Sequence, residues 1–311
     1  MAINKLWVEA YRPKSVTDYV WRDQIQKDQV MEWVKSKSIP HILLSGSPGT
    51  GKTTLAKVLI NELGVDEYDV FYANGSKEAR KIEWTEKLIS FCTTMPFGDF
   101  KVVLIDEADY MNKESVQPAL RNLMEDYSST VRFILTCNYP NKIIPPLHSR
   151  FQNIHIEKLD RIDFTERVAT ILVNENIIFD LNVLDTYVSA TYPDLRKCIN
   201  SLQQSCVNGE LIAPSTENSS VNDYKLQIVD LIKKGRIREG RKLLCNQVRS
   251  EEVDDVFRWM YDNLELWGPT EEQQDKAIVI IRNGLINHTM VTDVEINLAA
   301  TMIELAEVAN G

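Results

Sequence analysis

The amino-acid sequence predicts an α/β protein in which helices cover both faces of a parallel β-sheet, followed by helical regions. Three observations lead to this prediction. Short apolar runs alternate with helical patterns over residues 1–157, as in parallel sheets with connecting helices. A glycine-rich loop stands between an expected strand and an expected helix near residue 46. From residue 163 onward, apolar residues recur at helical spacing.

Five apolar runs in the first region are expected to be strands. The third has four apolar residues without alternation, which is typical of a strand buried on both faces in the middle of a parallel sheet. The five runs are Ile42–Leu44, Val70–Ala73, Val102–Ile105, Phe133–Thr136 and Asn153–Ile156.

The loop Gly46-Ser47-Pro48-Gly49-Thr50-Gly51-Lys52-Thr53 has the pattern G-x-x-x-x-G-K-[ST] of phosphate-binding loops. Glycines allow backbone N–H groups to close around phosphate oxygens, and the N-terminus of the following helix adds a positive partial charge. Lys52 can reach the β- and γ-phosphates of a nucleotide, and the Thr53 hydroxyl can ligate Mg²⁺. A strand before the loop and a helix after it argue against a chance match, so we expect a nucleoside triphosphatase.

Two acidic residues, Asp106 and Glu107, directly follow the expected strand Val102–Ile105. Ligands of open α/β sheets bind at the carboxyl ends of the strands, so we expect Asp106 beside the phosphate-binding loop. There Asp106 would hold Mg²⁺, directly or through water. Glu107 would orient and polarise the attacking water. Acids after a strand often only cap a loop, but their place beside this loop favours catalysis.

Composition is that of an ordinary soluble protein of two or three domains, with 311 residues, 44% hydrophobic and 26% charged. No targeting or membrane-spanning segment is expected, and the five cysteines lack metal-site spacing, which favours free thiols in the cytoplasm. The net charge is −10, but residues 1–157 carry 19 basic and 20 acidic side chains, and residues 214–311 carry 11 and 17. Because most of the acidic excess is C-terminal, a phosphate-binding surface on the first region stays possible.

The remaining chain divides at a polar segment. Residues 163 to about 213 have a helical pattern, and the run from Pro214 to Ser220 has no periodic apolar set. About five helical patterns follow and predict a small bundle. We therefore expect an α/β domain over 1–157, a helical domain over 158–213, a linker over 214–222 and a helical domain over 223–311.

Three further polar residues occur at informative places. Asn138 follows the strand Phe133–Thr136, where it could help to position water beside the γ-phosphate. Arg150 follows a helix-breaking stretch, and Arg196 lies in the helical second region. In isolation, such an asparagine is usually a turn residue and such an arginine is usually solvated. Their order after the phosphate-binding loop raises their significance.

In the order of its elements the chain resembles the AAA+ ATPases, and within them the clamp loaders. Trp7-Val8-Glu9-Ala10-Tyr11-Arg12-Pro13-Lys14, Asp106-Glu107-Ala108-Asp109 and Leu120–Glu125 resemble replication factor C small subunits. Those cellular proteins normally have Ser-Arg-Cys where this chain has Ser149-Arg150-Phe151. Asn74-Gly75-Ser76 and Pro193–Lys197 are more similar to the large clamp-loader subunit of T-even-type phages. The resemblance covers about residues 5–206.

The resemblance implies an architecture and roles for particular residues. It implies a RecA-like AAA+ nucleotide-binding domain, a helical lid over 158–213 and a helical collar over 223–311. Arg196 would contact the γ-phosphate of its own subunit, and Arg150 would reach into a neighbour's site. The residues implied to wrap the adenine are Val8, Glu9, Ala10, Tyr11 and Val20. Those implied to hold the phosphates are Gly49, Thr50, Gly51, Lys52, Thr53 and Thr54.

The implied cofactors are ATP and Mg²⁺, and the implied partners are a sliding clamp and primer–template DNA. Four copies of such a subunit with one different subunit would form a hetero-pentamer, in the host cytoplasm if a phage encodes it. Arg80, Lys81 and Lys113 stand at expected helix starts that would track the DNA backbone, although ordinary solvated charges explain them equally well. Met111 and Val116 could touch the clamp or belong to a helix core.

Three alternatives stay open. The first is a cellular replication factor C small subunit, and the second is another AAA+ motor that remodels DNA. The third is an inactive scaffold subunit, which would be expected to lack part of the site. The presence of Lys52, Thr53, Asp106 and Glu107 argues against it.

Overall fold

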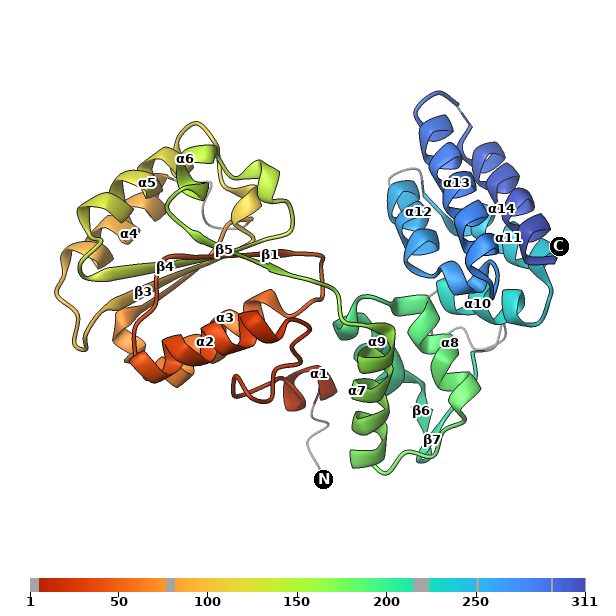
Figure 1. Cartoon of the computed structure of the whole chain (residues 1–311), viewed down its shortest axis with the longest axis horizontal. Coiled ribbons are helices and arrows are strands. Elements are labelled where there is room, and N and C mark those ends of the chain that lie inside the picture. The colour runs from red at the N-terminus through yellow and green to blue at the C-terminus, as the bar shows by residue number, and fades with distance from the viewer. Residues whose placement is uncertain (1–5, 77–81, 215–223, 250–251, 292, 311) are drawn as a thin grey trace. The chain divides into compact units, whose positions relative to one another are not determined.

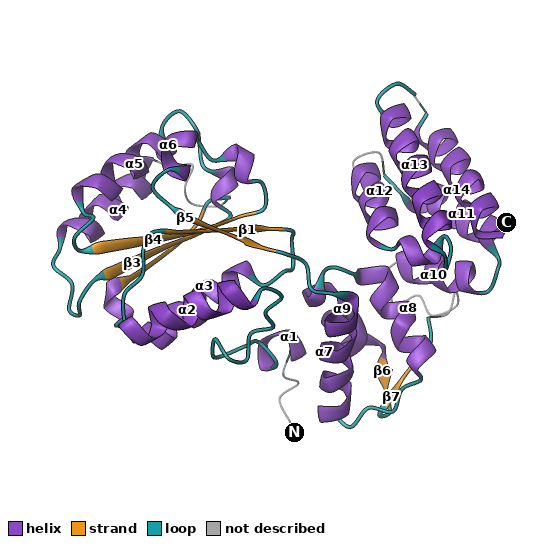
Figure 2. Ribbon diagram, viewed as in Figure 1, coloured by secondary structure: helices purple, strands orange, loops and turns teal. Residues whose placement is uncertain are grey.

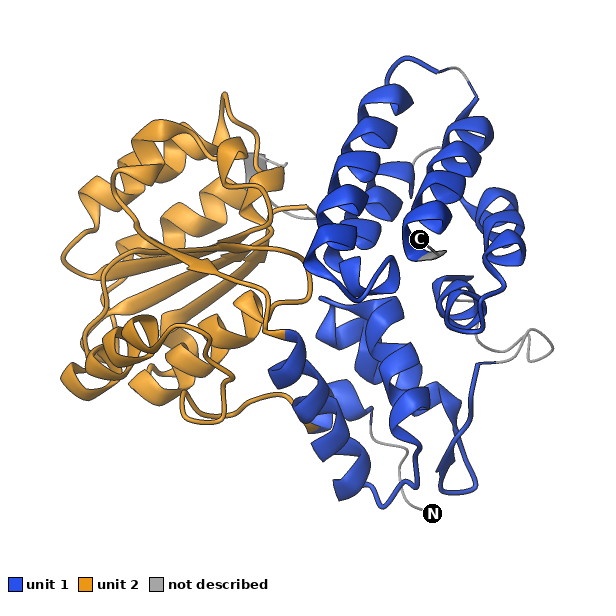
Figure 3. Ribbon diagram, turned by 45° about the vertical axis from the view of Figure 1, so that its right-hand side comes forward, with its two compact units in different colours: residues 1–10, 161–311 blue, residues 11–160 orange. Residues whose placement is uncertain are grey.

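The computed structural model describes residues 6–76, 82–214, 224–249, 252–291 and 293–310. The chain forms two compact units (Figure 3). One consists of residues 11–160, and the other combines residues 1–10 with residues 161–311.

The unit of residues 11–160 contains a parallel sheet of five strands in the order β2-β3-β4-β1-β5. All five strands expected from the sequence are confirmed, each with ends that differ by at most two residues. Their bounds are β1 Ile42–Gly46, β2 Val70–Asn74, β3 Lys101–Asp106, β4 Val131–Cys137 and β5 Gln152–Ile156.

Helices cover both faces of this sheet, with α2 and α3 on one face and α4, α5 and α6 on the other (Figures 1 and 2). The side chains of β3 explain the arrangement, because Val102 and Leu104 join the core on one face while Val103 and Ile105 join the core on the other. The non-alternating apolar run therefore marks a strand buried on both sides, as expected. The bounds are α2 Gln24–Ser36, α3 Lys52–Leu63, α4 Ile82–Thr93, α5 Val116–Asp126 and α6 Pro145–His148, with 3₁₀ turns at η1 Glu67–Asp69, η2 Ala108–Tyr110 and η3 Pro140–Lys142.

The second unit is mostly helical, and its described residues include the five helices expected after the linker. Their bounds are α10 Tyr224–Lys233, α11 Ile237–Gln247, α12 Val253–Asp262, α13 Glu271–His288 and α14 Val294–Asn310, with a 3₁₀ turn η5 at Leu264–Leu266. The earlier helices are α1 Trp7–Ala10, α7 Arg161–Asn174, α8 Leu181–Thr191 and α9 Leu195–Ser205.

One expectation for this unit is wrong, because the helical pattern does not continue to Ala213. Strands β6 (Cys206–Val207) and β7 (Glu210–Leu211) form a hairpin after α9. The two residues between them, Asn208 and Gly209, have φ of 53° and 83°. Asn-Gly is the pair that most readily adopts two successive left-handed conformations, so it closes a tight hairpin instead of continuing a helix.

The short helix α1 belongs to the helical unit. The backbone N–H of Trp7 donates to Oε1 of Gln203 on α9, at 2.9 Å, and the indole of Trp7 is buried. The sequence had grouped this segment with the α/β domain. The expected boundaries at 157/158, 213/214 and 222/223 stay predictions, and residues 215–223 of the linker lie outside the described residues.

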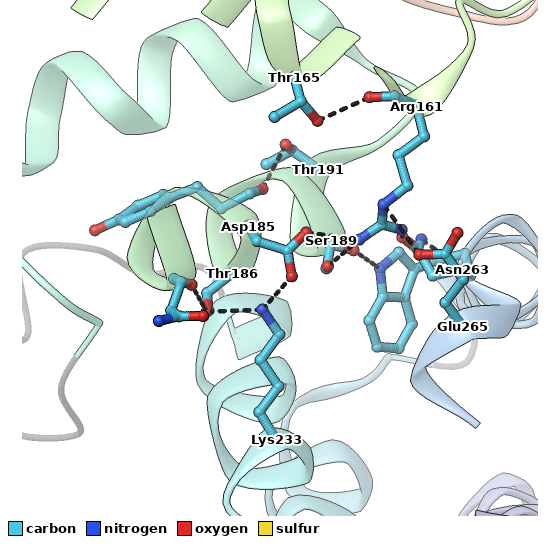
Figure 4. Close-up of polar contacts among 12 residues, drawn as sticks. Arg161, Thr165, Asp185, Thr186, Ser189, Thr191, Lys233, Asn263 and Glu265 are labelled. Atoms are coloured by element: carbon cyan, nitrogen blue, oxygen red, sulfur yellow. Dashed lines mark hydrogen bonds and ion pairs between the residues drawn. The ribbon is translucent and has the colours of Figure 1, made fainter. Parts of the chain in front are cut away.

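Polar contacts join α7 and α8 to the helices that follow (Figure 4). Arg161 donates to Asp185 and Ser189 on α8 and to Asn263 after α12, at 3.1, 2.5 and 3.3 Å. Lys233 at the end of α10 donates to Asp185 at 2.5 Å. Among the described residues, no helix is long and apolar enough to cross a membrane. All five cysteines are free thiols.

Candidate nucleotide-binding site

The phosphate-binding loop joins β1 to α3 in the first unit, as the sequence predicts. Its conformation requires glycine at two places. Gly46 has φ of 151°, and a Cβ there would lie 2.3 Å from the carbonyl oxygen of Ile156. Gly51, with φ of 92°, is the N-cap of α3. The loop therefore turns the backbone toward the N-terminus of α3, where orphan N–H groups can bind an anion.

Lys52 folds back over this loop. Its ammonium group donates to the carbonyl oxygens of Gly46 and Ser47, at 3.0 and 2.7 Å, and the side chain is buried. Thr50 and Thr54 lie in the loop and in the first turn of α3, both half-buried. The lysine is therefore held at the mouth of the loop, where its N–H groups can exchange the carbonyl acceptors for phosphate oxygens.

The sheet topology brings the expected metal ligands together. The hydroxyl of Thr53 donates to Oδ1 of Asp106 at 2.7 Å, although the two residues lie on different elements. A hydroxyl and a carboxylate are oxygen ligands of the kind that Mg²⁺ prefers. The donor set therefore fits a magnesium ion bound with a nucleotide.

Glu107 follows in an uncommon backbone conformation, with φ of 55°. Its N–H donates to the hydroxyl of Thr136 at 3.2 Å, and that hydroxyl donates to Asp106. The N–H of Gly75 donates to the carbonyl of Asp106 at 2.7 Å. The sequence places Thr136 at the end of an expected strand but does not predict a role for it. The signal that could have found it is its place at the end of a buried strand paired with β3.

Asn138 lies just past β4, which the sheet order places between β3 and β1. Its backbone N–H contacts Oδ1 of Asp109 at 3.4 Å. Asp109 is buried, and its Oδ2 has no hydrogen-bond partner among the described residues. The carboxyl ends of β1, β3 and β4 thus bring Lys52, Thr53, Asp106, Glu107 and Asn138 to one edge of the sheet.

Tyr19 supports the loop from outside, and the sequence gave no signal for it. Its hydroxyl donates to the carbonyl of Thr50 at 3.1 Å, and a Cβ at Gly51 would lie 3.1 Å from the same hydroxyl. Burial raises the pKa of Tyr19, so the phenol stays a proton donor. The adjacent Val20 is half-buried, as is Tyr11.

The other residues expected at the adenine belong to the second unit. Val8, Glu9 and Ala10 lie in α1, so the proposed adenine set is divided between the two units and stays a prediction. Arg196 is also in the second unit, exposed in the first turn of α9, whose N-cap Asp194 accepts from the Lys197 N–H at 3.0 Å. Its contact with the γ-phosphate stays a prediction.

Arg150 lies at the other end of the sheet from the phosphate-binding loop. It precedes β5, and the parallel register pairs Gln152 with Ile42 and Ile156 with Gly46. Four residue steps of about 3.3 Å along a strand place Arg150 more than about 13 Å from the loop in this direction. Arg150 donates to Glu125 and to the carbonyl of Pro146, the latter at 2.7 Å.

The expected DNA-binding residues are only partly described, because Arg80 and Lys81 lie outside the described residues. Lys113 is exposed in the turn before α5, whose helix begins three residues later than expected. Asn112 holds that turn by accepting from the N–H groups of Glu114 and Ser115, at 2.8 and 3.0 Å. Met111 and Val116 are buried, which favours their assignment to the core over a clamp contact.

Several known proteins resemble this chain, two of them over 97% of its length. Residues 42–158 match the family described as ATPase family associated with various cellular activities (AAA). The chain is 39% identical to the replication factor C small subunit of Sulfolobus acidocaldarius, over 97% of this chain and 95% of that protein. It is 33% identical to that of Saccharolobus solfataricus, over 97% and 83%. Identity to that of Sulfurisphaera tokodaii is 42%, over 66% of this chain and 64% of that protein.

Among solved structures, the RuvB Holliday junction branch migration motor of Thermotoga maritima has a similar fold. The TM-score is 0.55 at 17% identity, over 73% of this chain and 79% of that chain. A likeness at this level of identity concerns the fold alone.

Proposed function

Because this chain belongs to the replication factor C small subunit family of AAA+ ATPases, we propose that it is the ATP-hydrolysing subunit of a clamp loader. In this function the subunit would help to open a ring-shaped sliding clamp and to load it onto primer–template DNA during replication. The observation that carries the proposal is the convergence of Lys52, Thr53, Asp106, Glu107 and Asn138 at one edge of the sheet.

The chemistry follows from the positions of these side chains. Lys52 would exchange its two carbonyl partners for phosphate oxygens, and Thr53 with Asp106 would hold Mg²⁺. Mg²⁺ held by these two residues would supply positive charge to offset the negative charge that develops on the phosphate during transfer. Glu107 would accept a hydrogen bond from the attacking water and polarise it, and Asn138 would help to orient that water.

The position of Arg150 supports an oligomer. An arginine at the far end of the sheet cannot serve its own phosphate-binding loop, but it can complete the site of a neighbouring subunit. Such an arginine contributes about 10³–10⁵ in rate by neutralising transition-state charge. We therefore propose copies of this chain together with a different subunit, in a pentamer of four and one.

The loop before β3, which Asp69 holds by hydrogen bonds, is the surface that we propose for the clamp. Met95 and Phe97 are 81% and 80% exposed. The N–H groups of Phe97 and Gly98 each donate to Asp69 at 2.8 Å, and this carboxylate is fully buried. Large apolar side chains held out into solvent by a fixed loop are typical of protein-binding sites. DNA would contact Lys113 and, by sequence, Arg80 and Lys81.

We further propose that the loader is of the phage type, on the strength of Asn74-Gly75-Ser76, Ser149-Arg150-Phe151 and Pro193–Lys197. It would then act in the cytoplasm of the host. The named relatives support a cellular replication factor C small subunit equally well, since all of them carry that name. Identifying the replication genes that neighbour this one would separate the two.

The decisive experiment measures ATP hydrolysis by the chain, co-expressed with its neighbouring replication genes, in four conditions. These are no addition, primer–template DNA, the clamp, and DNA with clamp. A clamp loader is expected to respond most strongly to DNA and clamp together. Stimulation by branched DNA without any effect of the clamp would instead favour a DNA-remodelling motor, and absence of hydrolysis in every condition would favour a scaffold.

A further inference from the structure

Thr136 lies at the carboxyl end of β4, between two strands that carry the nucleotide site. Ile105 of β3 pairs with Leu135, which brings the next residue, Thr136, beside Asp106. On the other side Thr136 pairs with Leu44 of β1. Its side chain is 1% exposed. A hydroxyl buried to this depth has lost its water, so its protein partners decide its role.

Both partners of this hydroxyl come from the pair of acidic residues. The Thr136 hydroxyl donates to Oδ1 of Asp106, the oxygen that also accepts from Thr53 at 2.7 Å. It accepts from the backbone N–H of Glu107 at 3.2 Å. A hydroxyl has one proton and two lone pairs, so it can serve both neighbours at once. A methyl group in its place can serve neither.

The backbone at Glu107 needs such support. A φ of 55° is unfavourable for a residue with a Cβ, and it persists only where the surroundings hold it. Gly75, the residue after β2, supports the same turn, because its N–H donates to the carbonyl of Asp106 at 2.7 Å. A Cβ at Gly75 would lie 2.3 Å from the carbonyl oxygen of Glu107. The turn that carries Glu107 is thus fixed from both neighbouring strands.

From this geometry, and resting on the proposed ATPase function, we infer that Thr136 is a positioning residue for both acids. Its hydroxyl orients the carboxylate of Asp106 toward Thr53. The same hydroxyl holds the backbone N–H of Glu107 and so fixes the backbone conformation from which the Glu107 side chain projects. Thr136 itself touches neither nucleotide nor metal in this role. Partners that orient a metal ligand in this way typically contribute about 10- to 100-fold to metal affinity or activity.

The test uses two pairs of residues that differ by the hydroxyl. Threonine and Thr136→Val have nearly the same shape, and Thr136→Ser and Thr136→Ala both lack the methyl group. The full-length chain is titrated with Mg²⁺ in the presence of a fluorescent ATP analogue, and kcat, KM and the melting temperature without nucleotide are measured in parallel. We expect Thr136→Val and Thr136→Ala to need about 10- to 100-fold more Mg²⁺ for half-maximal binding and to lose kcat. Thr136→Ser should remain close to the wild type.

If Thr136 serves only in packing, the variants should group by shape and not by the presence of the hydroxyl. Thr136→Val would then behave as the wild type, and Thr136→Ser would be as impaired as Thr136→Ala, which would overturn the inference. If Thr136→Val does not fold, the comparison of Thr136→Ser with Thr136→Ala decides by itself. If the wild type binds the ATP analogue in a Mg²⁺-dependent way and the variants need the same Mg²⁺ concentration, the inference is wrong. The proposed function is then unaffected. A wild-type chain that does not bind nucleotide with Mg²⁺ would refute both.

Discussion

The guanidinium of Arg150 forms an ion pair with the carboxylate of Glu125 on α5. Both side chains are partly exposed, at 32% and 53%. A surface ion pair of this kind is worth about 0–1 kcal/mol, because water screens the charges and two long side chains must be ordered. Glu125 can therefore hold Arg150 at the end of the sheet without preventing the proposed action of Arg150 on a neighbouring subunit.

This relationship predicts different effects for its two partners. Arg150→Ala should bind nucleotide normally but fail to support hydrolysis in the adjacent subunit, with a loss of about 10³-fold or more in kcat. Glu125→Gln should change kcat far less, since it removes only a weak contact. Mixing Arg150→Ala with Lys52→Ala subunits should partly restore hydrolysis wherever an intact Arg150 faces an intact Lys52. Absence of activity in every mixture would contradict action in trans.

Glu107→Gln should separate binding from catalysis. The amide keeps the shape of the side chain but cannot polarise water, while Thr53 and Asp106 are unchanged. We expect nucleotide affinity close to the wild type and turnover lower by about 10²–10⁴-fold. Equilibrium binding of a labelled nucleotide and steady-state hydrolysis measure the two effects. Hydrolysis at the normal rate would show that another group activates the water.

The exposed loop before β3 should matter for the clamp and not for ATP. Met95→Ser combined with Phe97→Ser is expected to weaken clamp binding by about 10-fold or more, because buried aromatic anchors dominate such interfaces. Basal hydrolysis should not change. Ile25→Ser is the matched control, since Ile25 is 79% exposed on α2, away from this loop in sequence. Equal clamp affinity in the double variant and the wild type would remove the loop from the proposed interface.

The DNA assignment predicts a change in salt dependence. Replacement of Arg80, Lys81 and Lys113 by alanine should weaken primer–template binding for all sequences alike. Each lost phosphate contact should lower the slope of log affinity against log salt by about 0.9 on duplex DNA. Stimulation of hydrolysis by DNA, measured at several salt concentrations, gives both the apparent DNA affinity and its salt dependence. An unchanged slope would show that these residues are ordinary solvated charges and do not contact DNA phosphates.

Asp185 gives the helical unit a predictable response to acid. Burial raises the pKa of its carboxyl, but the hydrogen bonds and charges of Lys233 and Arg161 outweigh burial and lower the pKa below its ordinary value. A carboxyl with a lowered folded-state pKa stabilises the fold above its unfolded value of about 3.9. That stabilisation is lost as the pH falls through the folded-state pKa. Denaturation measured from pH 7 to about pH 2 should therefore show a smaller acid-induced loss in Asp185→Asn than in the control Asp254→Asn.

Local sequence determined the elements of the first unit and the order of its motifs. The non-alternating run Val102–Ile105 is typical of a strand covered on both faces, and the glycines at 46, 49 and 51 permit positive φ values that few other residues adopt. Short-range preferences suffice for such features, because they depend on backbone sterics and on the period of apolar residues. The hairpin at Asn208-Gly209 also follows from a local turn preference, which the expectation of a continuous helical pattern overlooked.

Only the tertiary structure decided which distant residues meet. Thr136 is 30 positions from Asp106, and Tyr19 is 31 positions from Thr50. Neither pairing has a local signature in the sequence. The placement of β4 between β3 and β1 creates the first contact, and the parallel pairing of β5 with β1 puts Arg150, which precedes β5, at the opposite end of the sheet from Lys52. Strand order and register arise from the packing of the whole sheet and its helices, so no segment of the chain encodes them alone.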